Sequence, residues 1–245
     1  TKRFNLSMTD STTIFTKQIV DKCLVPPLDF EGHLVAIGSD FSVRGDVWGT
    51  VIGYRENGHY YFKAIPVMPE SSEDKFKHLG ETITHEGVNN MSDEAWDAFM
   101  SAMNGSVPIA LNYDPKNFIN KFEQTYDIEF YNKVMQNSFK LSNTLEATQK
   151  LMDEGKIHFD SKLLAVHLMN AETKINDFGL MRIIKKGYTD KIDLADALIN
   201  LMWWFLESEE SGYDRRRKQK NARGVKNPSF WSKRNKDSYS IQKQP

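Results

Sequence analysis

Residues 34–67 read LVAIGSDFSVRGDVWGTVIGYRENGHYYFKAIPV, and this stretch decides the fold. It contains three runs rich in β-forming residues, at 34–41, 47–56 and 59–67. Asn57-Gly58 joins the last two runs, and an Asn-Gly pair in that position favours a tight hairpin turn. The stretch therefore predicts three antiparallel strands near the start of the folded region.

The flanking segments predict an α/β fold with a mixed central sheet of about five strands. Residues 1–30 show no clear period and end in Pro26-Pro27, so we interpret them as an irregular lead-in, and 69–91 as a polar loop. Hydrophobic periodicity with start and stop residues marks the other elements. We expect helices at 92–104, 115–126, 142–154, 161–171 and 190–207, strands at 107–113 and 128–134, and a hairpin formed by 173–175 and 180–184.

The composition is that of an ordinary globular protein, with 40% hydrophobic and 27% charged residues among 245. The single cysteine, Cys23, excludes an internal disulfide, and the longest apolar run, 197–206, is about half of a membrane span. The chain begins at Thr1 without an initiator Met or a signal sequence, so we expect a fragment of a longer protein.

Charge is distributed unevenly along the chain. Residues 213–245 hold 11 Lys and Arg against two Asp, a net charge of +9, whereas the preceding 212 residues carry −10. A basic tail on an acidic body favours attraction to a polyanion, with Arg215, Arg216 and Arg217 as candidate contacts. A solvated, disordered tail is the equal alternative.

Between residues 192 and 206, the helix expected at 190–207 is apolar on every face except one narrow stripe. At 100° per residue, Asp193, Asp196, Asn200 and Glu207 fall within about 60° of one another. Such a helix is buried, and a buried unpaired carboxylate is costly, so the stripe must face a compensating charge. A metal ion explains the whole stripe. The alternative is that Asp193 favours the helix N-terminus while Asp196 pairs with Lys or Arg.

Two more aspartates follow apolar runs, as ligands of divalent cations often do in α/β proteins. Asp40 ends the first expected strand, Asp114 follows the strand at 107–113, and Asp46 lies six residues beyond Asp40. Each also has a structural explanation, because Asp followed by Pro suits a helix start and the other two suit turns. If Asp40, Asp114 and Asp193 converge, the chain is a hydrolase of phosphodiesters.

The sequence lacks the other common catalytic motifs. It has no P-loop pattern, no H-E-x-x-H pattern and no Cys/His spacing typical of zinc sites. His158 and His167 lie near expected elements, and we interpret them as structural or surface histidines. The aspartates therefore remain the candidates for chemistry.

Several short segments share their order and spacing with one known family. They are Thr1–Asn5, Ile37–Ser42 with Asp46, Asn112–Pro115, Phe139–Thr144, Leu151–Ile157, Asn170-Ala171 and Lys191–Ile199. Together they resemble the C-terminal half of tailed-phage terminase large subunits, over residues 1–207. The resemblance implies a nuclease domain at 31–210 with a ribonuclease H-like fold, its sheet flanked by helices. It also implies a lead-in at 1–30 from a separate N-terminal ATPase domain, and a basic tail at 211–245.

The resemblance implies the chemistry as well. The domain is expected to be an endodeoxyribonuclease that cuts concatemeric double-stranded DNA in the host cytoplasm, with the small terminase subunit and the portal protein as partners and no membrane. Asp40, Asp114 and Asp193 would hold two divalent cations, Mg²⁺ or Mn²⁺, with Asp40 as the bridging ligand. Asp46 matches an acidic family position. Asp196 stands where the family commonly has an apolar residue, which leaves it as an extra ligand or a neighbour.

Some alternatives stay open at the level of sequence. Lys185 and Lys186 fall where the family often carries lysine, and they either contact phosphate or solvate a hairpin end. Another ribonuclease H-like nuclease, such as a resolvase or transposase core, would share the aspartates, although the segment 139–199 favours terminase. A non-catalytic module that docks DNA or the portal is the third reading.

Overall fold

The computed structural model describes residues 13–41, 47–69, 74–80, 83–85, 93–113, 128–135 and 139–210. Contacts within the chain divide it into two units, Thr1–Leu206 and Glu207–Pro245, and only Glu207–Glu210 of the second unit is described. The elements in chain order are α1 (Lys17–Cys23), β1 (Leu34–Asp40), β2 (Gly49–Glu56), β3 (His59–Ala64), β4 (Val67–Pro69), η1 (Lys77–Leu79), β5 (Ile83–His85), α3 (Asp93–Ala102), β6 (Val107–Tyr113), β7 (Phe130–Lys133), α5 (Phe139–Asp153), β8 (Ile157–Phe159), α6 (Lys162–Met169), β9 (Ala171–Ile175), β10 (Met181–Lys185) and α7 (Asp193–Glu210).

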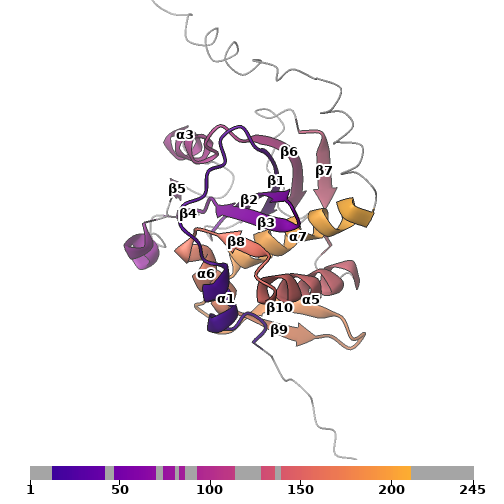
Figure 1. Ribbon diagram of the computed structural model, residues 1–245. Coiled ribbons are helices and arrows are strands. Elements are labelled where there is room, and N and C mark those ends of the chain that lie inside the picture. Colours follow the sequence, from indigo (N-terminus) through magenta and orange to yellow (C-terminus); the bar gives the residue numbers. More distant parts are fainter. Residues whose placement is uncertain are drawn as a thin grey trace, which may run out of the picture. The chain divides into compact units, whose positions relative to one another are not determined.

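A mixed sheet forms the centre of the first unit (Figure 1). Among the described residues it contains six strands in the order β7-β6-β1-β2-β3-β8. β2 is antiparallel to both β1 and β3, which confirms the three antiparallel strands predicted at the start. β6 pairs in parallel with β1, β7 with β6, and β8 with β3. The predicted α/β fold with a mixed sheet is therefore confirmed, with one strand more than expected.

The hairpin between β2 and β3 follows from its turn residues. Asn57 has φ of 51° and Gly58 has φ of 80°, the two positive values that a type I′ turn requires. The closing pair is Glu56 opposite His59. The turn thus sets the register of two central strands, and through β2 it sets the alignment with β1.

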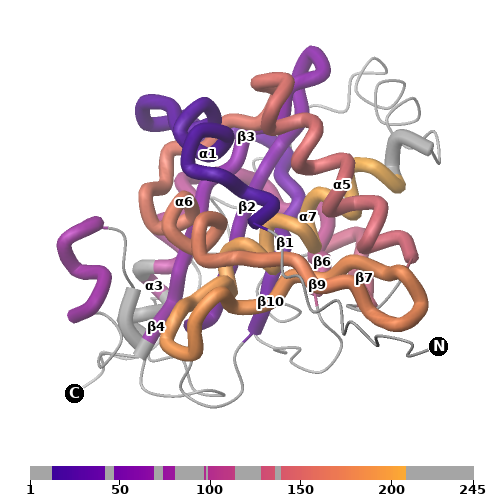
Figure 2. Tube along the Cα trace, turned by 90° about the horizontal axis from the view of Figure 1, so that it is seen from below, coloured from indigo at the N-terminus to yellow at the C-terminus, as the bar shows by residue number. Residues whose placement is uncertain are grey.

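Helices cover the two faces of the sheet differently (Figure 1). α7 lies against one face, where the larger hydrophobic core also includes residues of α1, α5 and α6. The β9–β10 hairpin packs against α5 on the side away from the sheet (Figure 2). On the other face, Phe99 and Met103 from α3 and the residues just after it join a smaller core. No described helix, α7 included, is long and apolar enough to cross a membrane.

The expectation of an irregular lead-in is wrong for part of residues 1–30. Lys17–Cys23 form α1, whose first turn is capped by Thr16, the acceptor of a 3.4 Å hydrogen bond from the Ile19 N–H group. Val20 and Cys23 are fully buried against the main core. A seven-residue helix is too short to show a clear period and depends on tertiary packing, so the sequence pattern missed it.

Two strands also differ from the expected boundaries. The run at 59–67 breaks at Pro66, which has no N–H group to donate to a sheet, so β3 ends at Ala64 and β4 pairs with β5 in a separate sheet. β8 was not predicted, because three residues between Gly155 and α6 are too few to show alternation. The helix expected at 115–126 lies outside the described residues.

Candidate functional site

The structure describes some of the predicted site residues. Asp40 is the half-buried last residue of β1, Asp193 is the first residue of α7 and is 7% exposed, and Asp196 is half-buried in the same helical turn. Lys185 and Lys186 are exposed at the end of β10. The other candidates lie outside the described residues: Asp46, Asp114, Arg215, Arg216 and Arg217.

Two glycines allow α7 to lie directly on the sheet. A Cβ atom on Gly38 of β1 would overlap the backbone of Ala197. A Cβ atom on Gly49, the first residue of β2, would lie 2.5 Å from the carbonyl carbon of Asp193 and 2.9 Å from the nitrogen of Leu194. Only glycine permits backbones to approach this closely. The start of α7 therefore rests on the start of β2.

The register of the sheet brings Asp40 to the same place. Asp40 lies directly opposite Gly49. Opposite residues of an antiparallel pair have Cα atoms about 4.5–5.5 Å apart and direct their Cβ atoms to the same face. Because the Cβ direction of Gly49 meets Asp193, the Asp40 side chain emerges on the face that α7 covers. The structure thus brings Asp40 and Asp193 together at the C-terminal end of β1.

The polar stripe of α7 faces β1. Asn200 is fully buried, and its Nδ2 atom donates a 3.0 Å hydrogen bond to the carbonyl oxygen of Ser39. The Ser39 hydroxyl in turn lies 3.2 Å from the hydroxyl of Thr50. Asn200 lies about two turns beyond Asp193 on the same side of the helix. This hydrogen bond therefore fixes the rotation of α7 and keeps Asp193 directed at the sheet.

Two side-chain amides, of the buried Asn112 and the half-buried Asn132, join the ends of the neighbouring strands. Asn112 of β6 donates to the carbonyl oxygen of Ile37 at 2.9 Å, and Asn132 of β7 donates to Oδ1 of Asn112 at 2.9 Å. Tyr113, the last residue of β6, lies opposite Ser39, which precedes Asp40. Neither amide was predicted to have a structural role. The signal at Asn112 is a polar residue inside an apolar run, which requires a buried hydrogen-bond partner.

Helix α6 holds the start of α7 from the other side. Ile192 occupies the N-cap position and has no side chain that could accept from the first N–H groups of the helix. The fully buried His167 takes the role of the capping side chain. Its Nδ1 atom accepts a 3.1 Å hydrogen bond from the Leu194 N–H group. That nitrogen therefore carries no proton. Asn170 Nδ2 also donates to the Lys191 carbonyl oxygen at 3.3 Å, so both flanks of Asp193 are anchored to α6.

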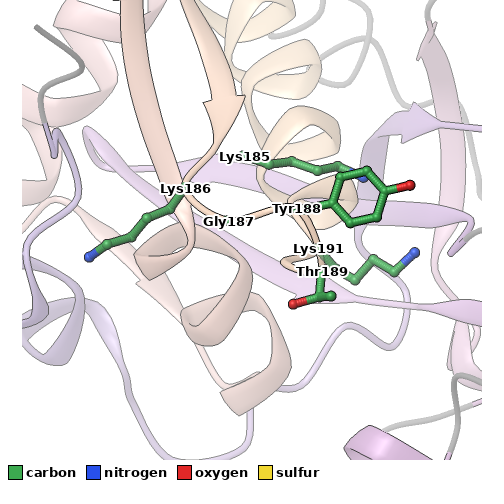
Figure 3. Close-up of a pocket in the computed structure, with 6 residues that line it drawn as sticks. All are labelled: Lys185, Lys186, Gly187, Tyr188, Thr189 and Lys191. Atoms are coloured by element: carbon green, nitrogen blue, oxygen red, sulfur yellow. The ribbon is translucent and has the colours of Figure 1, made fainter.

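The segment before α7 forms a pocket beside this site. It has a volume of about 660 Å³ and is lined by Lys185, Lys186, Gly187, Tyr188, Thr189 and Lys191 (Figure 3). Lysine and tyrosine side chains dominate this lining, and a single residue, Ile192, separates Lys191 from Asp193. A cationic pocket thus adjoins the acidic residues at the end of β1.

The donor set at this position suits a hard divalent cation. Asp40 and Asp193 offer carboxylate oxygens, the ligands that Mg²⁺ and Mn²⁺ prefer. Within the described ranges, no group of three or more His, Cys, Asp or Glu side chains gathers at one point. Asp46 and Asp114, the remaining acidic candidates, lie outside those ranges. The described residues therefore supply part of a metal site.

Comparison with known proteins matches this chain to one family. Residues 1–209 match the family described as terminase large subunit, endonuclease domain. No curated protein matches the chain. Similar solved structures include the large terminase of bacteriophage HK97, with a TM-score of 0.64 and 14% identity over 80% of this chain and 44% of that one. The large terminase nuclease of thermophilic phage G20c has a TM-score of 0.50 and 14% identity over 78% of this chain and 97% of that one. The large terminase of another thermophilic bacteriophage has a TM-score of 0.53 and 12% identity over 79% of this chain and 46% of that one.

The two kinds of match carry different information. At 14% identity the structural likeness establishes the fold, which agrees with the expected ribonuclease H-like α/β architecture. This chain spans less than half the length of the HK97 terminase. The family match extends over most of the chain. The chain therefore belongs to the family of terminase large-subunit endonuclease domains.

Proposed function

We propose that this nuclease domain is a metal-dependent endodeoxyribonuclease that cuts concatemeric double-stranded DNA by phosphodiester hydrolysis with two divalent cations. The observation that carries the proposal is the meeting of Asp40 and Asp193 across Gly49. The Asp40 side chain leaves the sheet on the face covered by the first turn of α7, which carries Asp193, and a cation bound there would offset the repulsion between two carboxylates. Membership of the terminase family supports DNA as the substrate.

The described residues fit such a cation site. Asp40 would bridge the two ions, Asp193 would hold one, and Asp114 would hold the other. Asp114 is bonded to Tyr113, whose position opposite Ser39 is described. Asp46 and Asp196 are further candidate ligands. When bound, Mg²⁺ or Mn²⁺ would lower the pKa of a water molecule and neutralise charge on the phosphate.

The protein itself supplies rigidity and orientation. Asn200 fixes the rotation of α7, and His167 fixes its first turn, so Asp193 is held before any substrate arrives. Preorganised ligands lose little when the transition state forms, which is how a fixed site accelerates hydrolysis. Lys185 and Lys191 of the neighbouring pocket would attract the DNA backbone to these carboxylates.

Nicking of supercoiled plasmid tests the proposal. The protein is expected to nick plasmid with Mn²⁺ or Mg²⁺ and not with EDTA, and Asp40→Asn and Asp193→Asn should each abolish nicking. Asp97→Asn is a matched control, because Asp97 is exposed on α3, on the opposite face of the sheet from α7. A folded protein that binds DNA but never nicks it would favour the docking module instead.

Further roles concern the longer protein. An N-terminal ATPase would drive packaging, and the small terminase subunit and the portal protein would be its partners in the host cytoplasm. The basic segment beyond the nuclease domain, with Arg215, Arg216 and Arg217, would contact DNA phosphates or the portal. DNA binding by a chain truncated after Gly212, measured across a salt series, would separate these two roles of the tail.

A further inference from the structure

We propose that the segment 185–191 between β10 and α7 binds one nucleotide unit of the DNA, with its phosphate held by Lys185 and Lys191 and its base or sugar packed on Tyr188. The inference rests on the proposed nuclease function and names a substrate contact of that site. It is carried by the pocket that these residues line, by the directions of their side chains and by the hydrogen bonds that hold the segment in place.

The backbone of the segment is fixed at both ends. The Lys186 N–H group donates to the Asn170 carbonyl oxygen at 3.0 Å, and Asn170 Nδ2 donates to the Lys191 carbonyl oxygen at 3.3 Å. Asn170, the C-cap residue of α6, thus holds both ends of the segment. Within the turn, the Asp190 N–H group donates to the Gly187 carbonyl oxygen at 3.1 Å. A segment held in this way need not become ordered when it binds a ligand, which saves conformational entropy.

A lysine from a distant segment braces the middle of the turn. Lys75 Nζ donates a 3.0 Å hydrogen bond to the Thr189 carbonyl oxygen. Its ammonium group also adds positive charge beside the pocket. The one acidic residue of the turn, Asp190, is half-buried, and a Cβ atom on Gly187 would lie 2.8 Å from its carboxylate. That carboxylate therefore lies against the backbone of the turn. Since the segment has three lysines and one aspartate, its net charge is positive.

The side chains that line the pocket extend in two directions. Lys185, Tyr188 and Lys191 extend to one side, whereas Lys186 extends to the other (Figure 3). Two lysines that flank an aromatic ring offer a phosphate contact and an apolar surface at once. Lys185 and Lys186 were the two lysines predicted from the sequence. This arrangement favours Lys185 and Lys191, rather than Lys186, as the contacts to phosphate.

Tyr188 argues for a nucleotide rather than a simple anion. It is 101% exposed, so it contributes almost nothing to the core. An exposed aromatic ring among cationic groups suits single-stranded or distorted DNA, because every base has a face that can stack. Lysines contact phosphates as point charges without reading sequence. The expected ligand is therefore any polynucleotide strand, bound without base preference.

The position of the pocket relates it to the reaction site. Lys191 is two residues from Asp193, and two residues of extended chain span at most about 7 Å. Adjacent phosphates along one DNA strand are separated by a similar distance. A strand whose reacting phosphate lies at Asp40 and Asp193 could therefore place a neighbouring phosphate between Lys185 and Lys191.

The test is DNA affinity across a salt series, with EDTA present to prevent cleavage. Fluorescence anisotropy with a labelled single strand should show weaker binding for Lys185→Ala with Lys191→Ala, and a salt slope reduced by about 0.7, the value for one phosphate of a single strand. Lys186→Ala is the matched control and should leave both values unchanged. Tyr188→Ala should weaken binding by at least about fivefold without altering the slope, and Tyr188→Phe should restore it.

Two results would overturn the inference. One is a Lys185/Lys191 double variant that binds DNA as tightly as the wild type, or no more weakly than Lys186→Ala. The other is a Tyr188→Ala variant with unchanged affinity, which would exclude a nucleotide. Plasmid nicking separates this outcome from failure of the proposed function. If the wild type nicks plasmid while the pocket variants bind DNA normally, only the proposed nucleotide site is rejected. If the wild type never nicks plasmid, the proposed nuclease function is rejected.

Discussion

Two regions at opposite ends of the central sheet differ in the side-chain contacts that their strands make. At the C-terminal end of β1, Asp40 lies opposite Gly49, and the backbone of Asp193 packs closely against Gly49. At the other end, aromatic rings stack from strand to strand: Tyr54 lies 5.0 Å from Tyr61, and Tyr61 lies 5.0 Å from His158, between ring centroids. The first region brings two acidic residues to one face of the sheet, whereas the second region stacks half-buried rings on one another.

The difference separates stability from function within one sheet. Stacked rings are favourable by themselves, at about 0.5–1.5 kcal/mol per pair beyond the area they bury. Converging carboxylates are unfavourable by themselves, and the proposed cations would offset their repulsion. We therefore expect changes at the aromatic end to lower stability without affecting metal binding, and changes at the acidic end to affect both.

The largest effect on stability is expected from Gly49→Ala. The added methyl group would overlap the backbone of Asp193, and neither β2 nor α7 can move without losing core contacts. A loss of about 3 kcal/mol or more of unfolding free energy is expected in urea denaturation. Gly187→Ala is the control, since its Cβ atom would meet only the movable carboxylate of Asp190. Equal stability of the two variants would show that α7 does not rest on β2 as described.

His167→Leu should have the next largest effect. It leaves the buried Leu194 N–H group without its acceptor, which costs about 1–3 kcal/mol. Because the same hydrogen bond fixes the turn that carries Asp193, Mn²⁺ affinity measured by calorimetry should also fall. His167→Asn keeps an acceptor near the Nδ1 position and should recover part of both. Loss of stability with unchanged Mn²⁺ affinity in the Leu variant would limit His167 to a structural role.

At the aromatic end, Tyr61→Ala should cost about 1–2 kcal/mol, because it removes the ring stacked on both Tyr54 and His158. Mn²⁺ should raise the melting temperature of this variant by as much as it raises that of the wild type. A smaller metal response would show that the two ends of the sheet are coupled.

The smallest effect concerns pH. Burial, together with the neighbouring His59, lowers the pKa of His158, whose Nε2 atom lies 2.8 Å from Nδ1 of His59. A histidine with a lowered pKa is protonated more readily in the unfolded chain, so it reduces stability as the pH falls below about 6.5. His158→Phe should make urea denaturation less dependent on pH between about 5 and 7. An unchanged pH dependence would exclude the histidine pair as its source.

Local signals made much of the fold predictable. Runs of apolar, β-forming residues predicted β1, β2 and β6, and Asn57-Gly58 predicted the hairpin, whose turn has positive φ values at both residues. Where the signal is short, prediction failed. β8 has three residues, and α1 has seven and depends on burial of Val20 and Cys23 against the main core.

The candidate site was predictable only in part. The apolar faces of α7 pointed to Asp193, because one stripe holds all the polar residues between positions 192 and 206. The role of Gly49 could not be read from the sequence, because it depends on which helix crosses β2. The same holds for His167, which caps a helix 27 residues further along the chain. Contacts of this kind are set by tertiary packing rather than by local pattern.

The most direct test of the central claim is the melting temperature with and without Mn²⁺ for the wild type and Asp40→Asn. Metal that binds only the folded state stabilises it, so millimolar Mn²⁺ should raise the melting temperature of the wild type. Asp40→Asn should abolish this rise, and without metal it should melt no lower than the wild type, because the repulsion with Asp193 is relieved. An equal rise in both proteins would contradict a shared cation at Asp40 and Asp193.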